Sequence, residues 1–327
     1  MNHKINKKVQ TSYIKTTIKQ KNYLYYLMTP AKLTTVYWAV NSLKIMNDPY
    51  FYEIKDEVLK RVQDCYCSNG GFSPNKKYPP TIYFTLSALQ ILFLYESDFY
   101  FTNKFNSIKT AEFIKSMQIP TGAFQNDEFG DIDTRIDCCA ILSLKLLELL
   151  EKKNFDKSGL KEPLNGNKKY FNMERFVEHI LNCFNIDGGA GQFENTESHS
   201  AQVFCCISAL RTLGLLNSID LEKVEEFIIY RQSQSGGFCG RLNKEADVCY
   251  SFWSFAVLKM IEEHKKEENK IDRTKFRNFI FSCKHENGGF SDKPGNVPDM
   301  FHQMFSLAAL SLLDEEGLNK VDSGFCI

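Results

Sequence analysis

Two kinds of apolar stretch alternate along the chain. One kind is apolar on nearly every side and contains a small residue followed by an aliphatic one: Ala88-Leu89, Ala140-Ile141, Ala209-Leu210, Ala256-Val257 and Ala309-Leu310. The other kind is apolar on one side only, as in Leu221 to Gln232 and Arg273 to Cys283. A helix that is apolar all round must be enclosed, whereas an amphipathic helix can face water. The pattern therefore predicts helical hairpins, each with an inner and an outer helix.

A glycine turn separates successive hairpins. The turns are Gly70-Gly71-Phe72, Gly122-Ala123-Phe124, Gly188-Gly189 with Phe193, Gly236-Gly237-Phe238 and Gly288-Gly289-Phe290. Counted from residues 71, 122, 189, 237 and 289, the spacings are 51, 67, 48 and 52 residues. A period of this size indicates a repeat architecture. Removing the polar segment 152–172 restores the period in the long interval, so we expect a surface insertion there.

A first unit begins near Tyr37-Trp38, which makes about six hairpins. We expect an all-α fold in which residues 23–327 form one domain, a closed α/α toroid with the inner helices in a ring. Apolar residues make up 43% of the chain and aromatic residues 13%, which is enough to line a central apolar cavity. The alternative is that these side chains fill the ring completely.

Charge excludes some functions. The 40 basic and 40 acidic side chains cancel, so no global field attracts nucleic acid. Residues 1–22 contain six lysines and no acidic residue, and we expect a frayed, solvated tail. No apolar run is long enough to be a transmembrane segment. The eleven cysteines lack the paired spacing of a disulfide framework, so we expect a cytoplasmic protein with free or metal-bound thiols.

Polar residues recur where the apolar stretches begin. Counted from Gly122, Gly189, Gly237 and Gly289, the residues are Arg135 at position 13, His199 at 10, Asp247 at 10, Cys249 at 12 and His302 at 13. Equivalent positions of a repeat lie at the same end of the ring, so we expect these groups to gather at one rim of the cavity.

Asp247, Cys249 and His302 offer a carboxylate, a thiol and an imidazole. Residues two apart on a continuous helix point away from each other, but an N-cap Asp can turn its carboxylate over the first turn toward Cys249. Three such ligands with one open position are typical of catalytic zinc. Each residue alone has a simpler explanation: Asp247 as an N-cap, Cys249 as a buried thiol and His302 as a hydrogen-bonded rim residue. Their coincidence at equivalent positions favours the metal.

A basic group lies beside this candidate metal site. Arg241 and Lys244 precede Asp247, Tyr250 follows Cys249, and His199 has the equivalent position one repeat earlier. Cationic side chains with Tyr and His near helix N-termini suit a diphosphate. As isolated turn residues, Arg241 and Lys244 would simply be solvated.

These residues lie in motifs that resemble the β subunits of protein prenyltransferases. The motifs are Glu197-Ser198-His199, Gly240-Arg241 through Lys244, Asp247-x-Cys249-Tyr250-Ser251 and Phe301-His302, and the resemblance runs over nearly the whole chain from about Tyr23. The resemblance implies that Asp247, Cys249 and His302 bind zinc. It also implies that His199, Arg241, Lys244 and Tyr250 hold an isoprenoid diphosphate, and that Phe252, Trp253 and Phe301 line a lipid channel.

Three relatives within this group compete: farnesyltransferase, type I geranylgeranyltransferase and the Rab (type II) geranylgeranyltransferase. Segments 131–135 and 198–206 and the ending Ser323-Gly324-Phe325-Cys326-Ile327 resemble the Rab enzyme best. Asn243-Lys244 and Ser251-Phe252-Trp253 look more like the other two. We expect the Rab enzyme's β subunit, with the other two as alternatives.

The resemblance implies geranylgeranyl transfer from its diphosphate to C-terminal cysteines of Rab GTPases. It also implies an α subunit as partner and an escort protein that presents the substrate. Asp292 lies ten residues before His302, where magnesium-dependent relatives have an acid, so we expect Mg²⁺ as well as Zn²⁺. A solvated turn Asp is the alternative.

Two residues bear on the length of the lipid. Thr34 stands where farnesyltransferase has a bulky Trp, and a small side chain leaves depth for a fourth isoprene unit. Tyr83 stands where the Rab enzyme has an aliphatic residue. We expect Thr34 to decide, because Trp blocks more volume than Tyr. Two remoter alternatives are a triterpene cyclase, which would need an acidic initiating motif that we do not find, and a non-catalytic helical scaffold.

Overall fold

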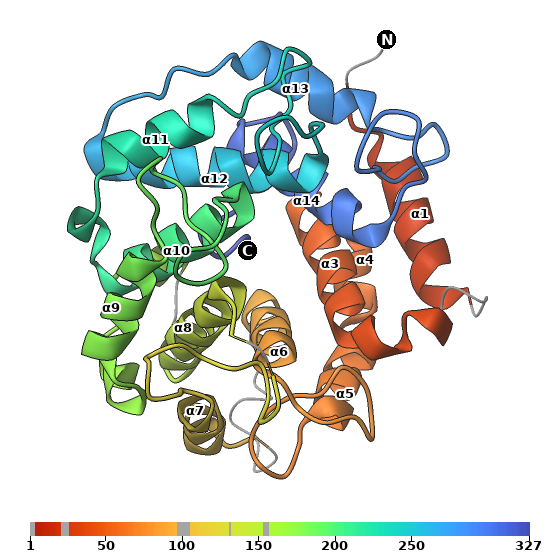
Figure 1. Ribbon diagram of the computed structural model, residues 1–327. Helices are drawn as coiled ribbons and strands as arrows, with labels where there is room; N and C mark the ends of the chain where they lie inside the picture. Colours follow the sequence, from red (N-terminus) through yellow and green to blue (C-terminus); the bar gives the residue numbers. More distant parts are fainter. Residues whose placement is uncertain (1–3, 21–25, 97–104, 131, 153–156) are drawn as a thin grey trace.

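The computed structural model describes residues 4–20, 26–96, 105–130, 132–152 and 157–327, which form two concentric layers of helices (Figure 1). The inner helices are α3 (Lys32–Ile45), α6 (Ile82–Leu94), α8 (Thr134–Leu150), α10 (Ser200–Leu213), α12 (Val248–Lys265) and α14 (Met300–Leu312). Each packs against the next, and α14 packs against α3. The ring is therefore closed, which confirms the predicted α/α toroid.

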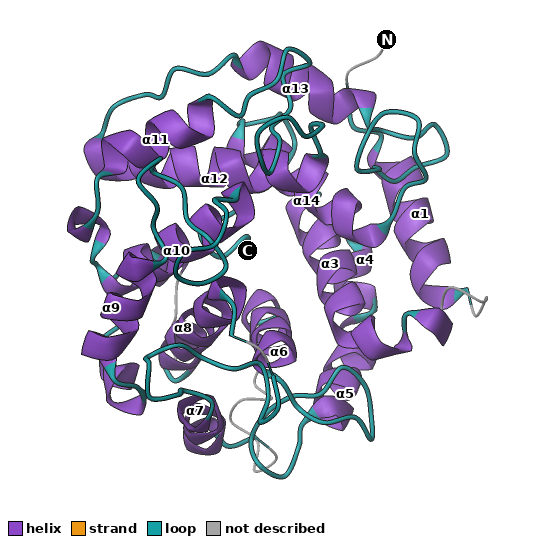
Figure 2. Ribbon diagram, viewed as in Figure 1, coloured by secondary structure: helices purple, strands orange, loops and turns teal. Residues whose placement is uncertain are grey.

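The outer helices are amphipathic. They are α1 (Lys7–Lys19), α5 (Lys55–Cys65), α7 (Ser107–Ser116), α9 (Met173–Asn182), α11 (Leu221–Ile229) and α13 (Arg273–Ser282). In α9 only Phe176 and Ile180 are buried, whereas eleven of the thirteen residues of α6 are buried. Short helices α4 (Tyr50–Glu53), η1 (Thr29–Ala31), η3 (Lys157–Leu160), η4 (Gly166–Tyr170) and η5 (Leu216–Ser218) complete the described elements. Figure 2 shows helices joined by loops, with no strand among the described residues.

Each glycine turn follows one outer helix and contacts the backbone of the next. At Gly236 the backbone has a φ of 94°, and a Cβ there would lie 2.3 Å from the backbone carbonyl of Lys275 in α13. The corresponding pairs are Gly70 with Lys109 of α7, Gly122 with Arg175 of α9, and Gly188 with Lys223 of α11. No other residue could adopt this φ and this approach without strain. The turns therefore set how far apart neighbouring hairpins lie.

The N-terminal segment differs from the expected frayed tail. Residues 7–19 form α1, which begins at the N-cap Asn6 and buries Ile14. The last glycine turn contacts it, because a Cβ at Gly288 would lie 2.7 Å from the Val9 carbonyl oxygen and Gln10 accepts the Gly289 N–H at 2.8 Å. The fifth and last glycine turn needs an outer helix to contact, and the N-terminal end of the chain supplies it. The expected boundary at residues 22–23 falls among residues outside the described set.

The segment after α8, expected as an insertion, lies over the ends of the inner helices. Within its described residues, Leu160 and Leu164 are buried, and the Leu164 N–H donates to the Thr212 carbonyl at 2.7 Å. The Glu148 carboxylate of α8 accepts the backbone N–H of Asn165 and pairs with Lys145 at 3.1 Å. These contacts hold the segment against α8 and α10.

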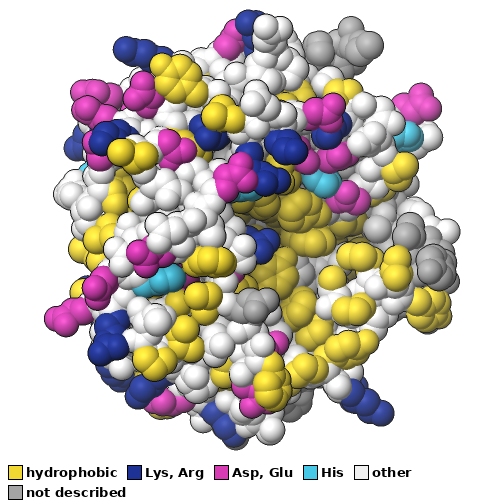
Figure 3. Space-filling model, viewed as in Figure 1, with side chains coloured by type: hydrophobic (Ala, Val, Ile, Leu, Met, Phe, Trp, Pro, Cys, Tyr) yellow, Lys and Arg dark blue, Asp and Glu magenta, His cyan; other side chains and the backbone are white. Residues whose placement is uncertain are grey.

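The ring encloses a hollow that opens on the face shown in Figure 3. Hydrophobic side chains line it, and charged and histidine side chains gather along one edge of its mouth. Tyr83 is 36% exposed, and its hydroxyl group lies beside Thr34 within the ring. Among the described residues, no helix has the length and apolarity needed to span a membrane.

We predict that Ile14→Ala lowers the free energy of unfolding by about 2–4 kcal/mol, because it leaves a cavity between α1 and the ring. Denaturant unfolding followed by circular dichroism measures this. Lys8→Ala, on the exposed side of the same helix, is the control and should change stability little. An unaltered midpoint for Ile14→Ala would contradict the packed position of α1.

Candidate active site

The candidate residues lie at or beside helix N-caps. Five inner helices begin with a capping residue in extended conformation whose side chain accepts a backbone N–H of the first turn: Thr81, Asp133, His199, Asp247 and Asp299. Capping satisfies N–H groups that have no partner inside the helix. Because the inner helices are parallel to one another, their N-termini lie on the same side of the ring. Capping therefore also places these side chains on one rim.

The structure brings Asp247, Cys249 and His302 together. Asp247 caps α12 and accepts the Cys249 N–H at 2.7 Å through Oδ1. His302 comes from the first turn of α14, and its Nε2 lies 3.6 Å from the same Oδ1. One ligand atom from each residue lies within 4.8 Å of the other two. The carboxylate does turn over the first helical turn, as the sequence predicted for an N-cap Asp.

Asp299 orients His302. It caps α14 by accepting the His302 N–H at 2.9 Å, and its other oxygen lies 2.6 Å from His302 Nδ1. The imidazole therefore turns Nε2 toward Asp247. A carboxylate behind a ligating histidine is common at metal sites because it fixes the ring and its tautomer. Asp299 is not among the site residues that the sequence predicted, although its place three residues before His302 is a recognisable capping position.

The electrostatics of these three residues suit a cation. Burial alone would lower the pKa of His302, but the nearby Asp247 carboxylate and the hydrogen bond to Asp299 raise it to about 9. Burial and the Asp247 carboxylate raise the pKa of the Cys249 thiol well above its ordinary value. Ligands around tetrahedral zinc lie about 3.5 Å apart, so a small inward movement of these side chains would accommodate the ion. The donor set therefore fits zinc.

His199 and Tyr250 form the adjoining part of the rim. Their rings lie 5.0 Å apart edge to face. His199 Nδ1 accepts the Ala201 N–H at 3.1 Å, so the neutral ring carries its proton on Nε2. Burial and the nearby guanidinium groups of Arg241 and Arg135 lower the pKa of His199 to about 4. At neutral pH, His199 is therefore a neutral donor among cations.

Gly240 makes this arrangement possible. A Cβ at this position would lie 2.8 Å from His199 Nε2 and 3.0 Å from the Tyr250 ring. Arg241 follows it and pairs with Glu197 at 2.9 Å. The role of Gly240 is not evident from its motif, because the close approach to His199 comes from another repeat.

Lys244 and Arg135 differ in their surroundings. Lys244 is exposed and borders an open groove with Ser233 and Asn278 on the outer side of the rim. Arg135, at the start of α8, is held by Asp133 through Nε and Nη2 and contributes to the positive field at His199. Of the candidate cations, Arg241 and Arg135 are thus the ones that act on His199. Asp131, in the segment used to compare subtypes, lies outside the described residues.

A continuous aromatic wall descends from the rim into the hollow. Trp253 lies 5.8 Å from Tyr250 and 6.1 Å from Phe301, and Phe301 lies 5.0 Å from Trp38 (ring centroids). Phe252 differs from the expectation that it lines the channel. It is fully buried and packs between Phe204 and Phe305, because it lies one position round the helix from Trp253. It supports the wall from behind.

Thr34 and Tyr83 lie on neighbouring inner helices. Thr34 Oγ1 lies 2.9 Å from Ser87 Oγ, and Ser87 donates to the Tyr83 carbonyl at 3.2 Å. Burial raises the pKa of Tyr83 to about 12, while a hydrogen bond to Thr34 opposes the shift. The two residues that bear on lipid length are therefore in direct contact.

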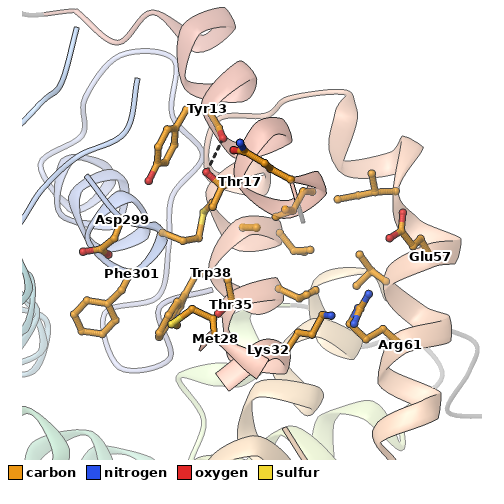
Figure 4. A pocket seen from close by; sticks show the side chains of 18 of the residues that line it. Tyr13, Thr17, Met28, Lys32, Thr35, Trp38, Glu57, Arg61, Asp299 and Phe301 are labelled. Carbon is orange, nitrogen blue, oxygen red and sulfur yellow. Dashed lines mark hydrogen bonds between the residues drawn. The ribbon is translucent and has the colours of Figure 1, made fainter. Parts of the chain in front are cut away.

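A separate groove of about 600 Å³ adjoins the site on the outer side of α3 (Figure 4). It lies between α1, α3 and α5, and Trp38 and Phe301 form its edge toward the hollow. Thr35 faces this groove, whereas its neighbour Thr34 bonds to Ser87 on α6. The two sides of α3 thus serve different cavities.

Asp292 lies beside the N-terminus of α12. Its carbonyl accepts the Val248 N–H at 3.0 Å, and its carboxylate accepts the Asn296 amide at 2.9 Å. The backbone contact places Asp292 next to Asp247, on the same rim as the candidate metal ligands.

The fold and the rim define a helical toroid with an open set of metal-type ligands at the mouth of an aromatic hollow. Residues 5–327 match the family model described as the prenyltransferase alpha-alpha toroid domain. The chain belongs to this family, as the sequence motifs predicted.

Among its relatives are the type-2 geranylgeranyl transferase β subunits of Saccharomyces cerevisiae and Candida albicans. Each is 33% identical to this chain. The first match covers 94% of the chain and 89% of the relative, and the second covers 85% and 79%. The solved structure of Candida albicans protein geranylgeranyltransferase-I complexed with GGPP has the same fold. Its TM-score is 0.78 at 23% identity, over 98% of this chain and 95% of that one.

We predict that Gly240→Ala weakens the affinity for inorganic diphosphate by about tenfold or more, since the added methyl group must displace His199 or Tyr250. Isothermal titration calorimetry measures the affinity, and circular dichroism checks the fold. Leu242→Ala is the matched control, because Leu242 lies in the same loop and is 63% exposed. Equal affinity in the two variants would argue against a diphosphate site at His199.

Proposed function

We propose that the chain is the catalytic β subunit of a type-2 geranylgeranyltransferase that modifies C-terminal cysteines of Rab-type GTPases. The observation that carries the proposal is the meeting of Asp247, Cys249 and His302 on the rim where α12 and α14 begin, beside the aromatic wall. The names of two relatives that are each 33% identical over most of this chain support the subtype. The type I enzyme and farnesyltransferase remain the alternatives.

The donor is geranylgeranyl diphosphate, with its lipid in the hollow and its diphosphate at the rim. Aromatic walls favour the apolar chain because removing it from water is favourable. The Nε2 proton of neutral His199, the Arg241 guanidinium and the Tyr250 hydroxyl are donors to the diphosphate oxygens, and Lys244 adds charge from the rim loop. Arg241 exchanges Glu197 for the diphosphate when the donor binds.

In the reaction, a bond forms between the acceptor sulfur and C1 of the donor, and the bond from C1 to the diphosphate oxygen breaks with its electron pair. Asp247, Cys249 and His302 would hold Zn²⁺, which keeps the acceptor thiol ionised at neutral pH. His199, Arg241 and Tyr250 stabilise the negative charge that grows on the departing diphosphate. The aromatic wall excludes water from C1, so the thiolate meets little competition from hydrolysis.

Further components follow from this assignment. An α subunit completes the enzyme, and an escort protein presents the Rab substrate. All eleven cysteines are free in the structure, which suits the reducing cytoplasm.

Asp292 binds Mg²⁺ together with the diphosphate. Turnover should rise as the Mg²⁺ concentration is raised through roughly the millimolar range, and the Asp292→Asn variant should lose that response. A response to Mg²⁺ that survives the substitution would exclude Asp292 as a ligand.

We predict that Cys249→Ala loses bound zinc and transfer activity together while keeping its helical signal, since one small side chain contributes little to the packing. Elemental analysis of the purified heterodimer and a single-turnover assay measure the two losses. Cys239→Ala, a buried thiol outside the ligand set, is the control. Undiminished zinc in Cys249→Ala would overturn the ligand assignment.

We predict that Thr34→Trp shifts the preference from geranylgeranyl to farnesyl diphosphate by about tenfold or more, because the indole takes up depth needed by the fourth isoprene unit. Initial rates at equal subsaturating donor concentrations measure the preference. Thr35→Trp is the matched control, since Thr35 faces the outer groove. Tyr83→Leu should mainly improve use of the longer donor. Faster farnesyl than geranylgeranyl transfer by the unmodified enzyme would show that Tyr83 decides instead.

A further inference from the structure

The final residues of the sequence lie inside the ring. Phe325, Cys326 and Ile327 are all buried, and the C-terminal mark lies near the centre of the ring in Figure 1. We call residues 322–327 the floor segment. Inner-helix side chains bond its backbone: Asn41 of α3 donates to the Cys326 carbonyl at 2.5 Å, and Gln90 of α6 donates to the Phe325 carbonyl at 3.0 Å.

These bonds give partners to three buried polar side chains of α3 and α6. Tyr37, Asn41 and Gln90 are buried, and the Tyr37 hydroxyl lies 3.4 Å from the Cys326 carbonyl. A backbone carbonyl in an apolar cavity is costly unless it is bonded. The bonds therefore let the backbone of the floor segment lie among apolar side chains.

An ion pair anchors the floor segment to α10. The Arg211 guanidinium bonds both oxygens of Asp322, at 2.9 and 2.8 Å, and both side chains are largely buried. Asp322 also accepts the N–H groups of Gly324 and Phe325 at 2.9 and 3.0 Å. Cys326 keeps a φ of 56°, which is uncommon for a residue other than glycine. The segment is therefore held in one conformation by contacts on several sides.

The position of the floor segment along the ring is informative. An α-helix rises about 1.5 Å per residue, so Gln90 lies about 5 Å below Ser87, and Asn41 lies about 10 Å below Thr34. The Thr34–Ser87 contact marks the depth in the ring at which the sequence predicts the limit on lipid length. The floor segment thus lies about one to two isoprene lengths deeper, since an extended isoprene unit spans about 5 Å.

Cys326 lies almost fully buried beside the inner helices α3 and α6. Cys326 and Tyr37 are each 5% exposed, and Gln90 is 6% exposed, whereas Asn41 is fully buried. Burial raises the pKa of the Tyr37 hydroxyl, and Cys326 and Tyr83 are near enough to raise it further. A path of neighbouring side chains therefore joins Tyr83, which is exposed to the hollow, to Cys326.

We propose that the floor segment is the stop against which the far end of the isoprenoid rests, so that the size of the residue at position 326 sets the longest donor that binds. This inference rests on the proposed function, because it assumes a prenyl diphosphate in the hollow. It adds a second determinant of length below Thr34 and Tyr83, contributed by a segment that belongs to none of the repeats.

The test compares the heterodimer carrying Cys326→Phe, Cys326→Ser or Cys326→Gly with the unmodified enzyme. Calorimetry measures affinities for prenyl diphosphates of fifteen, twenty and twenty-five carbons, and circular dichroism and zinc content check the fold. Cys326→Phe should lose about tenfold or more in affinity for the twenty-carbon donor relative to the fifteen-carbon one. Cys326→Ser, of equal size, should keep the native preference.

Cys326→Gly suits the positive φ and should fold, and it should gain affinity for the twenty-five-carbon donor relative to the twenty-carbon one. Folded Phe and Gly variants that keep the native preference would overturn the floor proposal while leaving the proposed function intact. An unmodified heterodimer that binds no prenyl diphosphate would overturn the proposed function, and the floor proposal with it. If Cys326→Phe does not fold, the result with Cys326→Gly decides alone.

Discussion

The contact between each glycine turn and the backbone of the next outer helix is the constraint on which the structure depends. At Gly236 the turn approaches Lys275 so closely that no side chain fits. Five such contacts around the ring fix the distance and angle between hairpins, and α14 packs against α3 to close it. A closed ring of apolar helices cannot be filled across its centre by side chains that point inward. The hollow is therefore a consequence of ring closure.

The chemistry follows from the direction of the inner helices. Each begins at the same rim, so the capping residues of five helices face the mouth of the hollow. Capping needs only a short polar side chain, and the protein varies that side chain from repeat to repeat. Asp247 is both a cap and a candidate ligand, Asp299 caps and orients His302, and His199 caps with Nδ1 while Nε2 stays free to donate. One structural need thus supplies a site with several kinds of polar group.

The hollow has two ends with different properties. The rim is polar and holds imidazole, guanidinium and carboxylate groups, with Arg241 paired to Glu197. The deep end is apolar because the floor segment satisfies its own polar groups against Tyr37, Asn41 and Gln90. A molecule with an anionic head and a long apolar tail matches this gradient in only one orientation. The anionic end of such a molecule would therefore lie beside Asp247, Cys249 and His302.

The sequence by itself determined the hairpins, their number, the ring and the gathering of Asp247, Cys249 and His302, because these depend on periodicity and on equivalent positions in a repeat. Only the tertiary structure decided the place of α1, the role of Gly240, the position of Phe252 behind Trp253 and the burial of Cys326. Each of these depends on contacts between residues far apart in the chain, as between Gln10 and Gly289 or between Asn41 and Cys326. A repeat pattern describes what neighbouring units share. It carries no information on how the two ends of the chain meet when the ring closes.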